Sequence, residues 1–393
     1  MISEKIINSL KGSSMIRAMF EEGERLRKIY GPDKVYDFSL GNPEVEPPVS
    51  VKKALQNLVN SYEEGLHRYM SNAGYYDVRE KIANYLNREK SSQLTGDNIV
   101  MTCGAAAGLN VVLKTILNPG EEVILFSPYF VEYIHYINNY DGKPIIVPTV
   151  KDTFEPDIDA FAKSITKNTK AVVINSPNNP TGVIYSEDTL IKMADVINRK
   201  QEEFNTNILL ISDEPYDKII YDDAKVPSVF KIFKNSVIVN SFSKSLALPG
   251  ERIGFIAAND KIDDVKTLVD GFILCNRILG FVNAPAIFQK VVAECLDAKV
   301  DVDGYKKKRN ILYNHLINLG FKCIKPQGAF YLFPKSPIED DKEFVKRAAN
   351  HNILVVPGSG FGCPGYFRLS YCISLETIEN SLPAFEALAK EFR

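Results

Sequence analysis

Apolar runs and helical patterns alternate along the middle of the chain, between residues 97 and 257. The runs are rich in Val, Ile and Leu without polar alternation, which is typical of strands buried on both faces. Because helical segments separate them, they predict an α/β fold with a mostly parallel seven-stranded sheet between helices. The predicted strands are residues 99–102, 122–126, 144–147, 170–174, 207–211, 236–240 and 252–257.

The two ends of the chain have a different pattern and predict a smaller α+β domain. A long helical pattern crosses residues 285–318, and short strands alternate with helices after it. Residues 1–30 also have a helical pattern, with Ile16, Met19 and Phe20 on one face. Further predicted elements are helices at 48–60, 75–88, 109–117, 340–350 and 375–391, and short strands at 35–40, 328–333 and 366–371.

A chain of 393 residues is long enough for two domains, each with its own core. We expect a large domain of residues 49–285, which contains the sheet. In the expected small domain, residues 1–48 join residues 286–393.

The charge balance argues against several classes of partner. Lys+Arg 47 and Asp+Glu 49 give a net charge of −2, which is unlike a nucleic-acid or anionic-membrane surface. No apolar run approaches the ~20 residues of a membrane span, and the first residues lack the apolar core of a signal peptide. Six cysteines without a C-x-x-C pair, and only four histidines, predict reduced thiols rather than disulfides or a metal site. We therefore expect a cytoplasmic protein.

One lysine, Lys244, stands just after the predicted strand at 236–240. A lysine amine in a water-excluded site can form an imine with an aldehyde. Ser241 and Ser243 beside it, and Arg252 eight residues further on, offer hydroxyl donors and a bidentate cation for a phosphate ester. A lysine next to a phosphate cradle indicates pyridoxal 5′-phosphate, although such residues are also common in surface loops.

Another strand end has small residues in place of bulky ones. Gly104, Ala105 and Ala106 follow the run at 99–102 and open an apolar helix. The free N–H groups and the positive dipole end of such a helix are suited to a phosphate. We expect these residues to complete the phosphate cradle.

Polar and aromatic residues end three more strands. Asp213 ends a strand in which residues 208–211 are all apolar, and a carboxylate beside a buried sheet needs a cationic partner such as a protonated pyridine nitrogen. Asn179 and Tyr216 could donate to the ring's phenolic oxygen, and Tyr129 could stack on the ring. Each has an alternative: Asp213 as a helix N-cap, residues 178–182 as a simple turn, and Tyr129 as a residue at the edge of the core.

Residues 357–363 contain a glycine pattern close to G-x-G-x-x-G, but Cys363 occupies the place of the third glycine. No helical pattern follows, so we interpret the segment as a flexible loop and not as a dinucleotide site. It leads to Arg368, which alternation places on the more polar face of a strand. A guanidinium there would bind a substrate carboxylate with two hydrogen bonds; the alternative is a surface charge.

The order of these stretches resembles the class I/II pyridoxal-phosphate-dependent aminotransferases, of fold type I and the aspartate aminotransferase type, over essentially the whole chain. The motifs are Ser-Pro-Asn-Asn-Pro-Thr-Gly at 176–182, Ser-Asp-Glu-Pro-Tyr at 212–216, Ser-Phe-Ser-Lys at 241–244 and Arg252. The resemblance implies an amino-acid aminotransferase that moves an amino group from an α-amino acid to a 2-oxo acid by a ping-pong mechanism. A C–S lyase or related lyase on the same scaffold is the alternative.

The resemblance also implies a role for each site residue. Lys244 would form the Schiff base and shuttle the proton. The other implied contacts are Asp213 with the pyridine nitrogen, Tyr216 and Asn179 with the phenolic oxygen, Tyr129 with the ring, and Arg368, Asn179 and the backbone of Gly41 with the substrate carboxylate.

Tyr69 is implied to reach the phosphate of a neighbouring subunit, so the working unit would be a homodimer.

Two positions depart from relatives. Ala106 replaces a lysine that helps aspartate-selective members read a distal carboxylate, and Arg277 is one position out of register with an arginine that acts across the dimer. An exposed helical arginine is the favoured interpretation of Arg277. The N-terminal helix, through Ile16, Met19 and Phe20, could line the pocket or simply pack.

Overall fold

The fold is taken from a computed structural model of the whole chain. It describes residues 1–11, 15–61 and 64–392, and gives only the backbone for residues 8–11, 15–20 and 32. The side chains of Ile16, Met19 and Phe20 therefore lie outside the described part of the chain.

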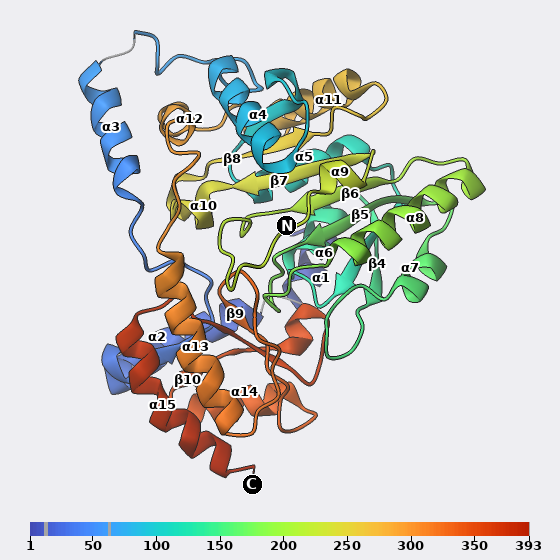
Figure 1. Cartoon of the computed structure of the whole chain (residues 1–393). Helices are drawn as coiled ribbons and strands as arrows, with labels where there is room; N and C mark the ends of the chain where they lie inside the picture. The colour runs from blue at the N-terminus through green and yellow to red at the C-terminus, as the bar shows by residue number, and fades with distance from the viewer. Residues whose placement is uncertain (12–14, 62–63, 393) are drawn as a thin grey trace.

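The central element is a seven-stranded sheet (Figure 1). Every neighbouring pair is parallel except the two pairs that involve β8, which is antiparallel to both of its neighbours. The seven strands and the mostly parallel sheet predicted from the sequence are thus confirmed. In spatial order the strands are β2 (Ile99–Thr102), β8 (Gly254–Ala258), β7 (Ser236–Ser241), β6 (Leu209–Asp213), β5 (Thr169–Asn175), β3 (Glu122–Ser127) and β4 (Lys143–Pro148).

Helices cover both faces of the sheet because successive strand residues point to opposite sides and are apolar on each. Leu209 and Ile211 belong to one apolar core, and Leu210 between them belongs to the other. The first core includes residues of α5 (Ala105–Ile116), α6 (Glu132–Asn139) and α11 (Val265–Ile278). The second includes residues of α3 (Val49–Ser61), α4 (Tyr76–Lys90), α7 (Ile158–Ser164), α8 (Glu187–Phe204), α9 (Val229–Ile232) and α12 (Ala286–Ala293).

A smaller α+β unit lies at one end of the large sheet, where the blue N-terminal and red C-terminal segments meet in Figure 1. Its core combines Phe38 near one end of the chain with Phe344 and Phe385 near the other. It contains a three-stranded antiparallel sheet of β11 (Val356–Pro357), β12 (Phe367–Ser370) and β9 (Tyr331–Leu332), and β1 (Tyr36–Asp37) paired in parallel with β10 (Ile353–Leu354). Its helices are α2 (Met15–Tyr30), α13 (Val302–Asn318), α14 (Asp341–Asn350) and α15 (Leu375–Lys390).

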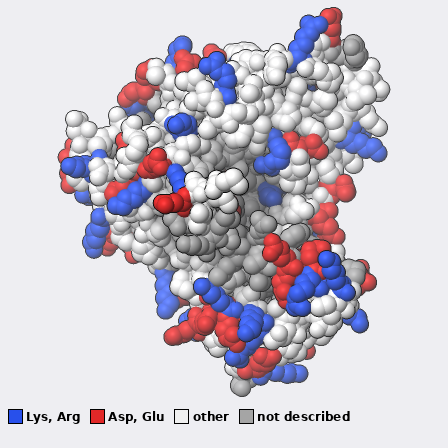
Figure 2. All heavy atoms as spheres, turned by 180° about the vertical axis from the view of Figure 1, so that it is seen from behind, with Lys and Arg blue, Asp and Glu red and all other residues white. Residues whose placement is uncertain are grey.

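The remaining elements are short. They are α1 (Glu4–Lys11), α10 (Phe242–Ser245), η1 (Pro32–Lys34), η2 (Gly96–Asn98), η3 (Pro249–Glu251) and η4 (Gly358–Phe361). On the face in Figure 2, lysine and arginine side chains are interspersed with aspartate and glutamate side chains, in line with the net charge of −2. Within the described ranges, no helix is long and apolar enough to cross a membrane.

Two predictions about local structure were wrong. The helical pattern at 285–318 is two helices, α12 and α13, because the Asp301 side chain caps a new helix by accepting from the Gly304 N–H at 2.8 Å. The segment at 357–363 is a turn of 3₁₀ helix in which Phe361 is buried, so it packs into the core instead of forming an open loop.

The division of the chain into domains can be refined. Val291 and Val292 of α12 belong to the core beside the large sheet, and Lys81 of α4 pairs with Glu294 at 2.5 Å just after α12. We therefore propose that the boundary, which the sequence placed after residue 285, lies between α12 and α13. The pairing of β1 with β10 supports assigning the N-terminal segment to the small domain.

Candidate active site

A pocket of about 200 Å³ opens where three neighbouring strands end. Asn175, Asp213 and Ser241 are the last residues of β5, β6 and β7, and all three line it. Ligands of open α/β sheets bind at this edge. The other lining residues are Ala105, Ala106, Leu109, Phe130, Tyr136, Asn179, Pro215, Tyr216, Ser243, Lys244, Pro249 and Arg252.

Lys244 enters the pocket from α10, the single helical turn that follows β7. Its Nζ donates to the backbone oxygen of Gly41 at 2.6 Å. Burial, helped by the Arg252 and Arg368 charges, lowers the pKa of the Lys244 ammonium to about 8. An appreciable fraction of this amine is therefore neutral near physiological pH, as a nucleophile or base requires.

Asp213 presents one partnered and one unpartnered oxygen. Its Oδ2 accepts from the Tyr133 hydroxyl at 2.6 Å, and its buried Oδ1 has no hydrogen-bond partner among the described residues. Burial raises the pKa of the Asp213 carboxyl to about 7, although the Tyr133 hydrogen bond opposes the shift. A buried oxygen without a donor fits a ligand that brings its own N–H.

One side of the pocket has the features of a phosphate site. Gly104 is the N-cap of α5 and has φ 83° and ψ 173°, a conformation that is essentially restricted to glycine. A Cβ on Gly104 would stand 2.8 Å from Nη2 of Arg252, so the absent side chain lets the guanidinium lie against the helix start. Ser241 and Ser243, both buried, line the same pocket. The sequence-predicted cradle residues are therefore brought together.

Arg368 lies beside the pocket and is 2% exposed. Its Nη1 donates to the Asn179 side-chain oxygen at 3.1 Å and its Nη2 to the Ser39 backbone oxygen at 2.5 Å, while Nε is buried without a partner in the described chain. Burial lowers the pKa of Arg368, and Tyr331 and Tyr216 counteract this shift. An incompletely satisfied buried guanidinium is suited to an anionic ligand such as a carboxylate.

Tyr216 is buried at the same end of the sheet, and its hydroxyl lies 2.8 Å from the hydroxyl of Tyr331. Burial raises the pKa of Tyr216 well above its ordinary value, so it stays protonated and can donate at neutral pH. Gly41 lies against Tyr331, because a Cβ on Gly41 would overlap the Tyr331 hydroxyl.

The aromatic residue that lines the pocket here is the one after the predicted Tyr129. Phe130 lines the pocket, whereas the Tyr129 ring packs against Gly362 and its backbone N–H donates to Phe361. This arrangement favours Phe130 over Tyr129 as the residue that stacks on a bound ring.

Two residues with implied roles across a dimer are exposed in the single chain. Tyr69 is 91% exposed, and the loop that follows it is held by Asn72 and Asn283, which donate to Val282 and Ser71 at 2.9 and 2.7 Å. Arg277 is also exposed.

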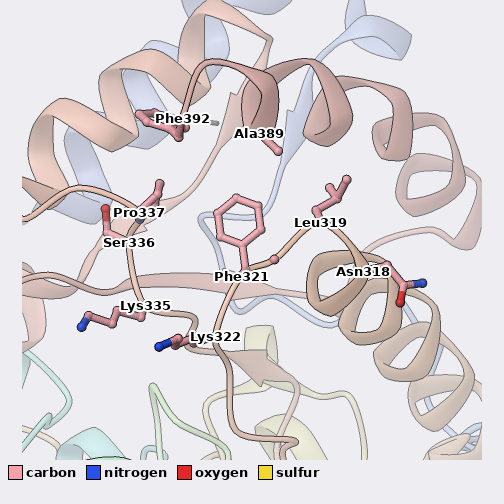
Figure 3. Close-up of a pocket in the computed structure, with 10 residues that line it drawn as sticks. Asn318, Leu319, Phe321, Lys322, Lys335, Ser336, Pro337, Ala389 and Phe392 are labelled. Atoms are coloured by element: carbon pink, nitrogen blue, oxygen red, sulfur yellow. The ribbon is translucent and has the colours of Figure 1, made fainter.

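A larger pocket, of about 500 Å³, lies in the small domain (Figure 3). Phe321 lies at its centre, and the exposed side chains of Lys322 and Lys335 lie at one edge. It is lined by the end of α13, the end of α15 and the chain around Ser336. The described residues that line it include no carboxylate side chain, whereas Asp213 and Lys244 both line the smaller pocket, so we place the candidate active site at the strand ends.

Sequence reasoning missed several residues of the site. Tyr133 supports Asp213 from a helix that precedes it by 80 residues. Asn175 accepts from the Asn179 N–H at 2.7 Å and donates to the Asp213 carbonyl at 2.8 Å, so it fixes both. Its place at the end of a predicted strand was a usable signal, whereas nothing in the sequence paired Tyr133 with Asp213.

Comparison with known proteins agrees with this geometry. The family model for aminotransferase class I and II matches residues 33–385. The aspartate aminotransferase of Pyrococcus horikoshii is 30% identical over 394 residues, which cover 98% of this chain and 96% of that protein. A probable aspartate aminotransferase of Methanocaldococcus jannaschii is 33% identical, with 88% of this chain and 91% of that protein covered.

Solved structures give the same result. An aminotransferase from Eubacterium rectale superposes with a TM-score of 0.96 and 39% identity, and 100% of both chains is covered. The Thermus thermophilus aspartate aminotransferase with maleate has a TM-score of 0.86 and 27% identity, with 99% of both chains covered. The resemblance found in the sequence is confirmed: the chain belongs to the class I and II aminotransferase family.

Proposed function

We propose that the pocket at the ends of β5, β6 and β7 is the active site of this pyridoxal-phosphate-dependent amino-acid aminotransferase, with Lys244 as its reactive amine. The observation that carries the proposal is the buried, unpartnered Oδ1 of Asp213 in the same pocket as Lys244. A carboxylate oxygen in this position fits a protonated pyridine nitrogen.

The residues present fit the cofactor at each of its polar groups. The N–H groups that begin α5, with Ser241, Ser243 and Arg252, would hold the phosphate. Tyr216 and Asn179 would donate to the phenolic oxygen, and Phe130 would cover one face of the ring. When bound, pyridoxal 5′-phosphate supplies an aldehyde for the amine and a ring that takes up electrons from the substrate's α-carbon.

The chain's own residues move and hold the protons. Lys244, with its pKa lowered to about 8, would act as the base that removes the α-proton and returns it to the cofactor carbon. Asp213, ionised beside the pyridine nitrogen, would keep a proton on that nitrogen throughout. Asp213 is buried and Lys244 is half-buried, which limits the access of bulk water to these protons.

Arg368 and Asn179 would bind the carboxylate that α-amino acids and 2-oxo acids share. The hydrogen bond between them presents guanidinium and amide donors to one point. This common anchor lets one site accept both substrates in turn. The names of the matched relatives make aspartate the first donor to assay.

We also propose a homodimer in the cytoplasm. Tyr69 projects into solvent from a loop held by Asn72 and Asn283, as expected of a side chain that serves the site of a neighbouring subunit. All six cysteines are free thiols, which persist in reducing compartments.

The test is an activity assay on the purified protein with added pyridoxal 5′-phosphate, a panel of amino donors and 2-oxoglutarate or oxaloacetate. We expect glutamate or aspartate to form only when both donor and oxo acid are present. Continuous release of pyruvate and ammonia from a sulfur amino acid, without an added oxo acid, would instead identify a lyase.

A further inference from the structure

Tyr331, on β9 of the small domain, contacts both Tyr216 and Arg368, yet no motif or proposed contact gives it a role. Its side chain is 2% exposed. Its hydroxyl lies 2.8 Å from that of Tyr216, and the two rings meet at 84° with their centroids 5.7 Å apart. The Tyr331 hydroxyl can therefore affect the hydrogen bond that the Tyr216 hydroxyl donates to a ligand.

The ring of Tyr331 makes a second contact. The Arg368 guanidinium carbon lies 4.8 Å from the Tyr331 ring centroid, a cation–π distance. Phe361 lies 4.7 Å from the same guanidinium. Because Arg368 has two aromatic rings around it and is almost fully buried, its direction is fixed before any carboxylate binds.

The hydroxyls of Tyr216 and Tyr331 carry one proton each, and this decides which of the two donates to the other. Burial raises the pKa of Tyr331 to about 12 and that of Tyr216 well above its ordinary value, so each hydroxyl keeps one proton at neutral pH. If the Tyr216 proton goes to the phenolic oxygen of the cofactor, Tyr216 can only accept from Tyr331. A hydroxyl that accepts a hydrogen bond becomes a stronger donor.

We propose that Tyr331 is a positioning residue with two separable parts. Its hydroxyl directs and strengthens the hydrogen bond that Tyr216 donates to the cofactor, and its ring holds Arg368 for the substrate carboxylate. This inference rests on the proposed function, since it requires the cofactor at Tyr216 and the carboxylate at Arg368.

Two variants separate the parts, and a third is the control. Tyr331→Phe removes only the hydroxyl, and Tyr331→Leu removes the ring as well. Tyr221→Phe is the matched control. Tyr221 is also buried, and its hydroxyl donates to the backbone oxygen of Ala329, two residues before Tyr331. Thermal unfolding of each variant checks that the fold is kept.

The first readout is the pH midpoint of the visible absorption band of the cofactor-bound protein. A weaker donor at the phenolic oxygen favours its protonated form, so Tyr331→Phe should raise the midpoint by about half a pH unit. The second readout is the donor concentration that half-saturates loss of the band without an oxo acid. Tyr331→Phe should leave it within about twofold, whereas Tyr331→Leu should raise it about three- to tenfold.

The inference fails if Tyr331→Phe titrates like the wild type, or if Tyr221→Phe shifts the midpoint equally. It also fails if Tyr331→Leu keeps the wild-type half-saturating concentration. A wild-type protein that forms no visible band would overturn the proposed function itself, and this inference with it. The two failures are therefore distinguishable.

Discussion

Asp213 and Lys244 show how burial prepares individual residues for the reaction. The pKa of Asp213 rises to about 7 and that of Lys244 falls to about 8, so burial moves each toward its neutral form. A bound pyridinium would restore the Asp213 charge, and the neutral amine is the reactive form of Lys244. The lowered pKa of Lys244 suits the proposed acid–base role, whereas the raised pKa of Asp213 reflects a buried carboxylate without a cationic partner.

Asp213→Asn removes the charge and keeps the shape of the side chain. We expect it to lower kcat by about 10²–10³-fold, because a preorganised charge in a buried site contributes on this scale. Steady-state kinetics at saturating cofactor measure the effect. An activity within about threefold of the wild type would show that Asp213 does not serve the pyridine nitrogen.

The same residue gives a pH dependence of stability in the cofactor-free protein. Its folded-state pKa of about 7 is above the ordinary 3.8, so the folded state binds the proton more tightly than the unfolded state. The Asp213 contribution is favourable below pH 3.8 and is lost as the pH rises to about 7, with a slope of at most about 1.4 kcal/mol per pH unit.

Denaturant unfolding of the wild type and Asp213→Asn between pH 5 and pH 7 isolates this contribution, because other titrating groups are common to both. We expect the difference in unfolding free energy to shift in favour of Asp213→Asn as the pH rises. A constant difference would contradict the raised pKa.

At the level of single residues, the sequence predicts the reactive groups better than their supports. Lys244, Asp213 and Arg252 stand at strand ends or in fixed spacing, which a sequence displays. The residues that support the site depend on long-range packing. Tyr331, for example, reaches the hydroxyl of Tyr216 across 115 residues. The finding that Phe130, and not Tyr129, lines the pocket has the same origin, because the backbone that follows β3 determines which of the two rings faces the pocket.

At the scale of elements, we expect phosphate binding to depend most on the start of α5. Its N-cap, Gly104, combines a left-handed φ with close approach of Arg252, so two constraints meet at one position. The end of a helix alone would attract an anion only modestly. The nearby guanidinium makes this end a stronger site.

Gly104→Ala should displace Arg252 and strain the backbone. We expect pyridoxal 5′-phosphate to bind about 10–100-fold more weakly, which is the effect of losing one charge-assisted hydrogen bond to the phosphate. The matched control is Gly120→Ala, since Gly120 also has a positive φ, +85°, but nothing within 4 Å of an added Cβ. Titration of both with the cofactor tests this, and equal affinities in the two variants would contradict it.

The strands of the sheet were predictable because apolar runs on both faces leave few alternatives. The break between α12 and α13 was not, since residues 294–301 contain no glycine or proline. Tertiary contacts fix this turn: the Val300 N–H donates to Ser245 at 3.2 Å, and Lys218 donates to Leu296. Only the Asp301 cap was visible in the sequence as a helix start.

At the scale of the whole molecule, the site joins segments from both ends and the middle of the chain. Lys244 contacts Gly41, and Arg368 contacts Asn179 and Ser39. Of the residues proposed to bind the substrate carboxylate, Arg368 thus comes from the small domain, whereas Asn179 and the proposed reactive amine of Lys244 come from the large one. Two-domain organisation was predictable from the changing pattern, but these contacts required the fold.

The proposed dimer can be tested by complementation. Lys244→Ala and Tyr69→Ala protomers are each expected to be nearly inactive, but a mixed dimer should contain one intact site if Tyr69 acts in the partner's site. Unfolding and refolding an equimolar mixture should restore about a quarter of the wild-type activity, since about half of the dimers are mixed. No recovery in a mixture shown to exchange subunits would place Tyr69 in its own site.

The most direct test of the account is a spectrum of the half reaction. Wild-type protein loaded with pyridoxal 5′-phosphate is mixed with an amino donor and no oxo acid, alongside Lys244→Ala. We predict that the wild type loses its visible band and releases 2-oxo acid in an amount equal to its sites, whereas Lys244→Ala releases none at a comparable rate. Stoichiometric release by Lys244→Ala at the wild-type rate, or no bound chromophore in the wild type, would contradict the assignment of Lys244 as the reactive amine.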